Sequence, residues 1–471
     1  MKMRVVTLAL LLLVGGALAV VWSQGTQRQV SLVVTNATVV TMDAAGRVIA
    51  NGAVAVDGSD IVGVDTADAI GRQFRGAETI DAAGQVVMPG LINTHTHAPM
   101  VLFRGLADDL SLMDWLTKYI FPAEAKTVSP EFVRAGTRLA TLEMIQSGTT
   151  TYADMYYFEE EVAKETKAAG MRGVLGETII QFPVADAKTP AEALARAETF
   201  IKTFKGDALV TPAVAPHAIY TNDGATLTAA RNLSKRYGVP TLIHLAETQD
   251  EVKTTQEKYK QSPVAYLDSL GFLSPGVLAA HAVWVSDADV AVLKARGVGV
   301  SHNPESNMKL ASGTAPVPAY LKAGVALGLG TDGAASNNDL DMFESMRMAA
   351  FLHKLQSMDP RAVSAKDALQ MATIGGARAL GMERQIGSLE TGKKADLIVV
   401  GMSSARQTPM YDPISHLVYV TRGDDVRTTI VNGKVLMRDR KMLTLNEPAI
   451  LQETRGWADM VRAAVKVDAA K

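Results

Sequence analysis

Eight apolar segments of strand length alternate with helical patterns through the middle of the chain, and this alternation most constrains the fold. Their lengths and flanking turn residues favour buried strands, and helices with clear start and stop signals separate them. One such helix begins at a Ser129 cap, has Pro130 in its first turn, and ends before Gly148. Eight consecutive strand–helix units favour a (β/α)₈ TIM barrel over an open sheet. The expected strands lie in residues 90–97, 149–155, 172–179, 209–220, 240–247, 277–285, 297–304 and 325–338.

Nearly every one of these strands turns polar at its C-terminal end. In a (β/α)₈ barrel all these ends point to one face, where active sites are built. Histidines that only pack a core have no reason to gather there. The polar residues are His95, His97, Asp154, Glu177, His217, His244, Glu247, His281, His302 and Asp332.

Two of the eight histidines, His95 and His97, stand one residue apart in "GLINTHTHAPM". Residues i and i+2 of a strand point the same way, so both imidazoles face one spot, as two ligands of a transition metal do. The alternative is a polar strand end with two unrelated exposed histidines. A mononuclear site needs three or four ligands. His244 in "HLAE" and Asp332 in "GTDG" supply the remaining two.

Composition excludes several classes of function. The 471 residues carry a formal net charge of −2 and no long basic run, so a nucleic-acid partner is not expected. The chain has no cysteine. Disulfides, thiolate zinc sites, a cysteine nucleophile and the cysteine-ligated type of zinc deaminase are therefore excluded.

Both ends of the chain have a sequence pattern typical of a small β domain. Short β-rich pieces and hairpin signals at Asp57-Gly58 and Asn432-Gly433 flank the barrel region. We expect a β-sandwich assembled from residues 30–88 and 389–445, a barrel over 89–388, and a helical tail over 446–471.

The first 29 residues resemble a secretory signal. Lys2 and Arg4 precede the apolar run Val5–Trp22, and Ala17-Leu18-Ala19 is a candidate cleavage site. The run is also at the lower edge of what spans a bilayer, so an uncleaved anchor stays open. We expect an exported protein, periplasmic in a Gram-negative source or membrane-anchored through its N-terminus. We also expect a homo-oligomer.

Taken together, these motifs resemble the amidohydrolase superfamily over about residues 30–445. The signature of that superfamily is HxH after strand 1, a His after strand 5, a His after strand 6 and an Asp after strand 8. "MPGLINTHTH", "HLAET", "SHNPESNMKLASG" and "GTDGAASNNDLDMFESMR" are most similar to its 5-methylthioadenosine/S-adenosylhomocysteine deaminases and related chlorohydrolases.

The resemblance implies a deaminase of an adenine nucleoside (5′-methylthioadenosine, adenosine or S-adenosylhomocysteine) that releases ammonia. One divalent metal is expected, zinc or alternatively iron, because the strand 4 segment has no lysine to bridge two metals. His95, His97, His244 and Asp332 are the implied ligands. Asp332 can also take the proton of the attacking water, and a bound metal lowers the pKa of that water to about 7.

Further roles follow from the resemblance. Glu247 would protonate the purine ring, with helix opening as the alternative. His281 would hydrogen-bond the attacking oxygen or be structural. Glu124 would hold ribose hydroxyls or be a solvated carboxylate, and His217 would contact the nucleoside or be structural. His302 could shape the pocket, whereas we expect His353 and His416 to be surface or packing residues.

Two other functions remain open from the sequence. The same scaffold could hydrolyse guanine, cytosine, a chlorotriazine or another cyclic amidine, although Glu124 and His217 favour a nucleoside. An exported binding protein without turnover is the other alternative.

The sequence also bears on the 5′ end of the substrate. In "RGVLGETIIQFP", Glu177 stands about where an arginine would meet the carboxylate of S-adenosylhomocysteine, and Arg172 should face the opposite end of the barrel. We therefore expect 5′-methylthioadenosine or adenosine to be preferred over S-adenosylhomocysteine by about tenfold or more in kcat/KM.

Overall fold

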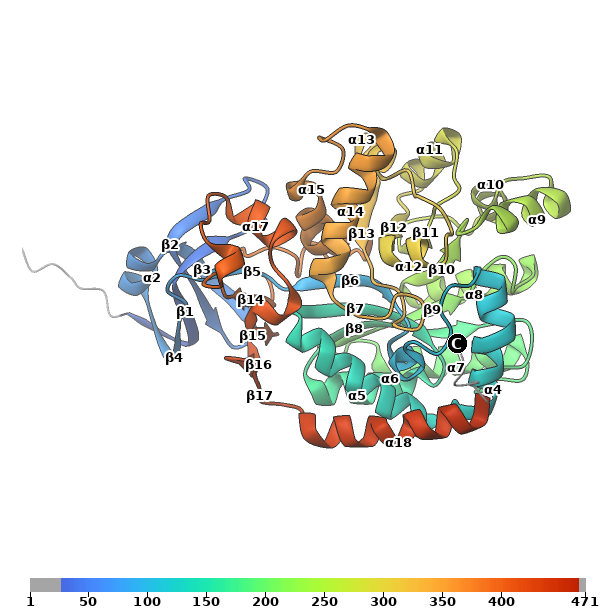
Figure 1. Cartoon of the computed structure of the whole chain (residues 1–471), viewed down its shortest axis with the longest axis horizontal. Coiled ribbons are helices and arrows are strands. Elements are labelled where there is room, and N and C mark those ends of the chain that lie inside the picture. The colour runs from blue at the N-terminus through green and yellow to red at the C-terminus, as the bar shows by residue number, and fades with distance from the viewer. Residues whose placement is uncertain (1–26, 466–471) are drawn as a thin grey trace, which may run out of the picture.

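The computed structural model describes residues 27–465 and confirms the predicted barrel. Eight parallel strands close on themselves in chain order, β13 pairing with β6 through Leu329 and Asn93. They are β6 (Leu91–Thr96), β7 (Thr149–Tyr156), β8 (Arg172–Ile179), β9 (Val210–Pro216), β10 (Thr241–Leu245), β11 (Val277–His281), β12 (Gly299–His302) and β13 (Ala326–Leu329). Figure 1 shows this barrel beside a smaller β domain.

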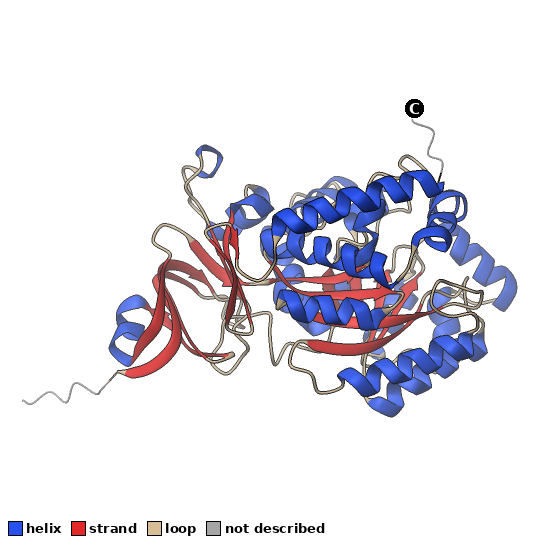
Figure 2. Cartoon of the chain, turned by 90° about the horizontal axis from the view of Figure 1, so that it is seen from below, coloured by secondary structure: helices blue, strands red, loops and turns tan. Residues whose placement is uncertain are grey.

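Helices cover the outside of the barrel (Figure 2). Every residue of β7 and of β8 is buried, as expected for parallel strands covered on both faces. Ser129 caps the first long helix by accepting from the backbone N–H of Phe132, which confirms the predicted start. The covering helices include α5 (Pro130–Gln146), α6 (Glu159–Ala169), α7 (Pro190–Phe204), α8 (Gly224–Tyr237), α9 (Gln249–Tyr259), α10 (Pro263–Ser269), α11 (Asp287–Ala295), α13 (Val317–Ala323) and α14 (Met342–Ser357).

The small domain is one mixed sheet made from both ends of the chain. The antiparallel pairing of β5 with β14, for example Val87 opposite Val399, joins the two ends. The predicted turns at Asp57-Gly58 and Asn432-Gly433 connect β2 to β3 and β15 to β16. The strands are β1 (Arg28–Val40), β2 (Val48–Asp57), β3 (Asp60–Thr66), β4 (Phe74–Asp81), β5 (Val86–Pro89), β14 (Leu397–Val400), β15 (Val426–Val431), β16 (Lys434–Arg438) and β17 (Lys441–Met442).

A buried ion pair joins the β domain to the N-terminal end of the barrel. Arg172, the first residue of β8, donates from Nε to Asp396 Oδ2 at 2.7 Å and from Nη2 to Asp396 Oδ1 at 3.1 Å. Both side chains are 3% exposed. Arg172 therefore faces away from the C-terminal strand ends, as the sequence predicted.

The last helix, α18 (Glu447–Val465), returns along the barrel and packs on α5 and α4 (Phe121–Thr127), as Figure 1 shows. Trp457 meets Phe132 edge to face, and Lys126 Nζ donates to the carbonyl of Ala464 at 2.9 Å. This helix thus supports the segment that carries Glu124.

No helix within residues 27–465 is long and apolar enough to cross a membrane. The apolar run on which the predicted leader or anchor rests lies outside the described residues.

Candidate active site

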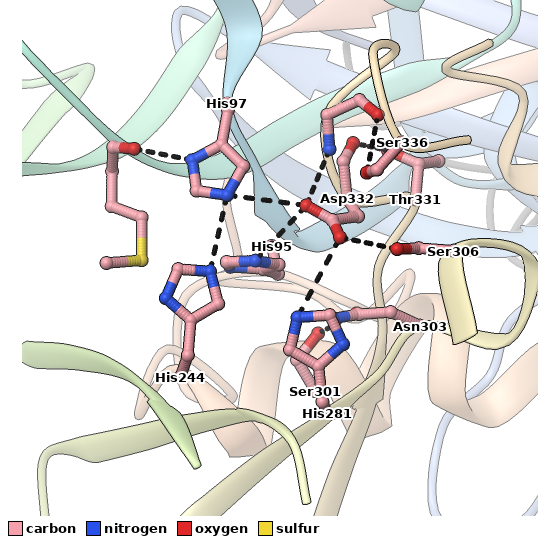
Figure 3. Close-up of polar contacts among 12 residues, drawn as sticks. His95, His97, His244, His281, Ser301, Asn303, Ser306, Thr331, Asp332 and Ser336 are labelled. Atoms are coloured by element: carbon pink, nitrogen blue, oxygen red, sulfur yellow. Dashed lines mark hydrogen bonds and ion pairs between the residues drawn. The ribbon is translucent and has the colours of Figure 1, made fainter. Parts of the chain in front are cut away.

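Four imidazoles and one carboxylate meet at the C-terminal end of the barrel (Figure 3). His95 and His97 come from the end of β6, His244 from β10 and His281 from β11, while Asp332 follows β13. The ring centres of His95 and His97 are 4.9 Å apart, and those of His95 and His244 are 4.8 Å apart. The barrel thus brings together residues that are far apart in the sequence.

Backbone carbonyls fix the tautomers of two of these imidazoles. His97 Nδ1 lies 2.6 Å from the carbonyl of Met155, and His244 Nδ1 lies 2.8 Å from the carbonyl of His217. A carbonyl only accepts, so each Nδ1 carries the hydrogen and each Nε2 presents a lone pair. The two Nε2 atoms face each other at 3.3 Å.

Two facing lone pairs repel unless a cation lies between them. A third imidazole also lacks a partner that a cation would supply: His95 Nε2 is buried and makes no hydrogen bond within the described part of the chain. Protonation of these imidazoles does not readily relieve the repulsion, because burial lowers the pKa of His95 to about 4 and that of His244 well below its usual range.

Asp332 completes the donor set. Its Oδ1 lies 3.4 Å from His95 Nε2 and 3.3 Å from His97 Nε2. Ser306 donates to Oδ2 at 2.7 Å and holds the carboxylate in place. Asp332 has a left-handed backbone with φ +66°, a strained conformation that is typical of functional sites.

Three imidazole nitrogens and one carboxylate oxygen form the N/O ligand set that zinc prefers, with room for water. The carbonyls behind His97 and His244 and the hydroxyl behind Asp332 are the outer partners that orient metal ligands in proteins. The residues present therefore fit a divalent metal ion.

Glu247 and His281 flank this donor set. Glu247 Oε1 accepts from Ser312 Oγ at 3.3 Å, and its Oε2 lies 3.8 Å from His281 Nε2. The same Nε2 is 3.8 Å from Asp332 Oδ2, so His281 stands between two carboxylates. Burial raises the pKa of Glu247, so this carboxyl holds a proton more readily than an exposed glutamate does.

A pocket opens beside these groups, and Glu124 and His217 line it. Glu124 lies on α4 and is 7% exposed, so it is not a solvated carboxylate. Its Oε1 accepts from Tyr156 Oη at 2.8 Å, and burial raises its pKa to about 7. His217 follows β9, with Nδ1 3.1 Å from Thr221 Oγ1.

The segment between β6 and α5 supplies an apolar wall of this pocket, which the sequence did not reveal. No lysine or arginine of residues 27–465 lines the pocket, and its carboxylates are Glu124, Glu247 and Asp332. The residues of this apolar wall are Leu112, Trp115, Leu116, Ile120 and Phe121.

The prediction that Glu177 meets the 5′ end of the substrate is wrong. Glu177 is buried outside the pocket, where it accepts from Arg196 Nε at 2.8 Å and from the backbone N–H of Glu159 at 3.2 Å. Its neighbour Thr178 lines the pocket instead. Adjacent residues of a strand point to opposite faces, so an error of one residue exchanged the two.

The structure places His302 away from the pocket lining. Its Nε2 lies 3.0 Å from Nε2 of His353, and both residues are buried. His353 is therefore a packing residue, as expected, while His416 is half-buried.

The motif "SHNPESNMKLASG" gave no sign of which of its residues reach the site. Four of them do so through polar contacts with the groups described above: Ser306 with Asp332, Ser312 with Glu247, Asn307 Oδ1 with His281 Nδ1 at 2.9 Å, and Asn303 Nδ2 with the same Nδ1 at 3.3 Å.

The chain matches known proteins over most of its length. Residues 86–436 match the Amidohydrolase family. A 5-methylthioadenosine/S-adenosylhomocysteine deaminase of Syntrophobacter fumaroxidans is 48% identical over 431 residues, 92% of this chain and 98% of that protein. A 5′-deoxyadenosine deaminase of Methanosarcina mazei is 46% identical over 439 residues, 92% and 99% of the two chains.

A solved structure is similar over the whole fold. The adenosine deaminase of Xanthomonas campestris with bound zinc has a TM-score of 0.91 and 39% identity, covering 93% of this chain and 100% of that one. The chain belongs to the amidohydrolase family, as its motifs predicted.

Proposed function

We propose that the protein is a hydrolytic deaminase of adenine nucleosides, which replaces the 6-amino group with oxygen and releases ammonia. The observation that carries the proposal is the set of inward-facing imidazole lone pairs and Asp332 beside the buried acid Glu247. The names of the relatives, which are nucleoside deaminases, support it.

His95, His97, His244 and Asp332 would hold one divalent metal ion. Zinc is the preferred ion over iron, since the ligand set suits it and the Xanthomonas campestris enzyme contains it. When bound, such an ion lowers the pKa of its water to about 7 and so supplies hydroxide at neutral pH.

The protein's own groups would move the protons. Asp332, oriented by Ser306, takes the proton of the attacking water. Glu247 gives a proton to the purine ring nitrogen and then helps protonate the departing amine. His281 donates from Nδ1 to Asn307 Oδ1 and lies between Glu247 and Asp332, and these two carboxylates raise its pKa despite burial. In its protonated form it would donate from Nε2 to the attacking oxygen and stabilise charge on it.

Glu124 and His217 would recognise the sugar part of a nucleoside. The buried carboxylate of Glu124 accepts from Tyr156 at Oε1, and its remaining lone pairs can accept from ribose hydroxyls. A free base such as guanine or cytosine has no ribose hydroxyls to donate to these lone pairs, which disfavours such substrates.

The 5′ substituent would be small and uncharged. The apolar wall suits a methylthio group or a 5′-methyl group, whereas the pocket lining offers an amino-acid carboxylate no cation to pair with. The preference expected from the sequence is thus kept, but for a different reason from the one based on Glu177.

Ammonia release from a panel of nucleosides and bases, together with metal analysis, tests the proposal. We expect turnover of 5′-methylthioadenosine, 5′-deoxyadenosine and adenosine. Turnover of guanine or a chlorotriazine in place of nucleosides would contradict the proposal, and binding without turnover would favour a binding protein.

Export and self-association are further parts of the proposal, and both rest on the sequence. N-terminal sequencing of the mature protein from cell fractions would distinguish a cleaved leader from an anchor. Light scattering of the purified protein would measure the expected homo-oligomer.

A further inference from the structure

Glu251 makes an unusual contact at the start of α9. It is the third residue of this helix, whose N-cap Thr248 accepts from the Glu251 N–H at 3.2 Å. A glutamate at this position ordinarily reaches back to the N–H of the cap itself. Here it reaches further: Oε1 accepts from the N–H of Ala246 at 3.0 Å and Oε2 from the N–H of Glu247 at 3.0 Å.

The turn that it holds has a strained backbone. Ala246 has φ +50°, a left-handed conformation that an alanine rarely adopts without support. On the other side of the turn, the carbonyl of Ala246 accepts from the N–H groups of Val283 and Trp284 at 3.1 and 2.9 Å. The peptide before Glu247 is thus fixed on both sides.

This turn decides where the Glu247 carboxyl lies, because Glu247 follows Ala246 directly. The only other side-chain contact to Glu247 among the hydrogen bonds of the described residues is the longer one from Ser312, at 3.3 Å. Glu251 itself is 4% exposed and does not line the pocket.

We infer that Glu251 is a positioning residue, whose carboxylate holds the strained Ala246–Glu247 turn so that Glu247 points at the reacting ring. The inference rests on the proposed role of Glu247. A carboxylate suits this task because it can accept at both oxygens, whereas an amide offers one acceptor and turns its NH₂ towards the second N–H.

The test compares Glu251→Gln with a matched control. Asp289 is the third residue of α11, is buried, and accepts from the N–H of Ser286 at 2.9 Å in an ordinary capping box away from the pocket. Both E251Q and D289N remove one buried carboxylate from a helix start. Stability lost through capping alone should therefore be similar in the two variants.

For E251Q we expect kcat to fall by about tenfold or more while KM and bound metal per chain stay unchanged, since only the orientation of the Glu247 carboxyl is altered. D289N should keep its kcat. An E251Q enzyme with unchanged kcat would overturn the inference, as would a loss of kcat that only follows a loss of metal.

If E251Q does not fold, Glu251→Asp serves instead. Aspartate keeps the charge at the helix start but is one methylene shorter, so it cannot reach both N–H groups. The same pattern in kcat, KM and metal is expected, and an unchanged kcat in folded E251D would overturn the inference. E247Q and the unchanged enzyme, measured alongside, separate the claims. No ammonia release by the unchanged enzyme refutes the proposed function, and full activity in E247Q refutes the proton-transfer role of Glu247. Loss of activity in E247Q but not in E251Q refutes only the role of Glu251.

Discussion

Replacing Glu124 with glutamine should lower kcat/KM for nucleosides, and only because the contact with the ribose hydroxyls is weakened. The buried carboxylate is bonded to Tyr156 and, in the proposed complex, would accept from the 2′- and 3′-hydroxyls. Charge-assisted hydrogen bonds contribute about 1.5–3 kcal/mol each. Losing one acceptor and the charge should therefore lower kcat/KM by roughly 10- to 150-fold.

The assay compares 5′-deoxyadenosine with its 2′-deoxy analogue on the unchanged enzyme and on E124Q. If Glu124 binds the 2′-hydroxyl, removing the carboxylate and removing the hydroxyl affect the same contact. Expressed as free energy, the loss in kcat/KM from both changes together should then be smaller than the sum of the two separate losses. Fully additive losses, which means the same fold loss in kcat/KM from E124Q on both substrates, would refute this reasoning.

The raised pKa of Glu124 predicts that the preference for a 2′-hydroxyl depends on pH. Burial raises the pKa of Glu124 to about 7. The carboxylate that accepts two hydroxyls is therefore present above this pH and is lost as the pH falls through it. In the unchanged enzyme the advantage of 5′-deoxyadenosine over its 2′-deoxy analogue should shrink below pH 7, and in E124Q it should not change with pH.

Three further predictions concern the rest of the site. His244→Ala should remove most of the bound metal, because the loss of one of four ligands weakens metal affinity sharply; metal analysis that finds a full complement would contradict the ligand assignment. Glu247→Gln should keep its metal and fold but lose about 10²-fold or more in kcat, since only proton transfer is removed, and a rate near that of the unchanged enzyme would contradict its role. 5′-Methylthioadenosine should be preferred over S-adenosylhomocysteine by about tenfold or more in kcat/KM, and an equal or reversed ratio at one pH would contradict the apolar 5′ pocket.

The barrel and the convergence of the candidate metal-binding residues were predictable because they depend on local pattern. Strand ends of a parallel barrel share one face, so polar residues such as His244 and Asp332 could be placed together without knowing any distance. The apolar wall around Trp115 was not predictable in this way. It lies on three short consecutive helices, Leu112–Trp115, Leu116–Ile120 and Phe121–Thr127, and the last of them packs against α18. Their placement depends on such distant contacts and not on a local pattern.

Errors arose where one residue of register or a distant contact decides the outcome. Glu177 and Thr178 exchange faces with a shift of one residue, and only the pairing of β8 fixes that register. Glu251 carries a helix-start pattern with Thr248, and nothing in that pattern indicates that its carboxylate reaches past the cap to Ala246.

The most direct test of the account is to remove and restore the metal while following ammonia release from 5′-methylthioadenosine. The account predicts about one zinc ion per chain in the active protein, loss of activity in proportion to metal removed by a chelator, and recovery when one equivalent of zinc is returned. Full activity in the metal-free protein, or zinc that stays bound in a protein that deaminates no adenine nucleoside, would contradict it.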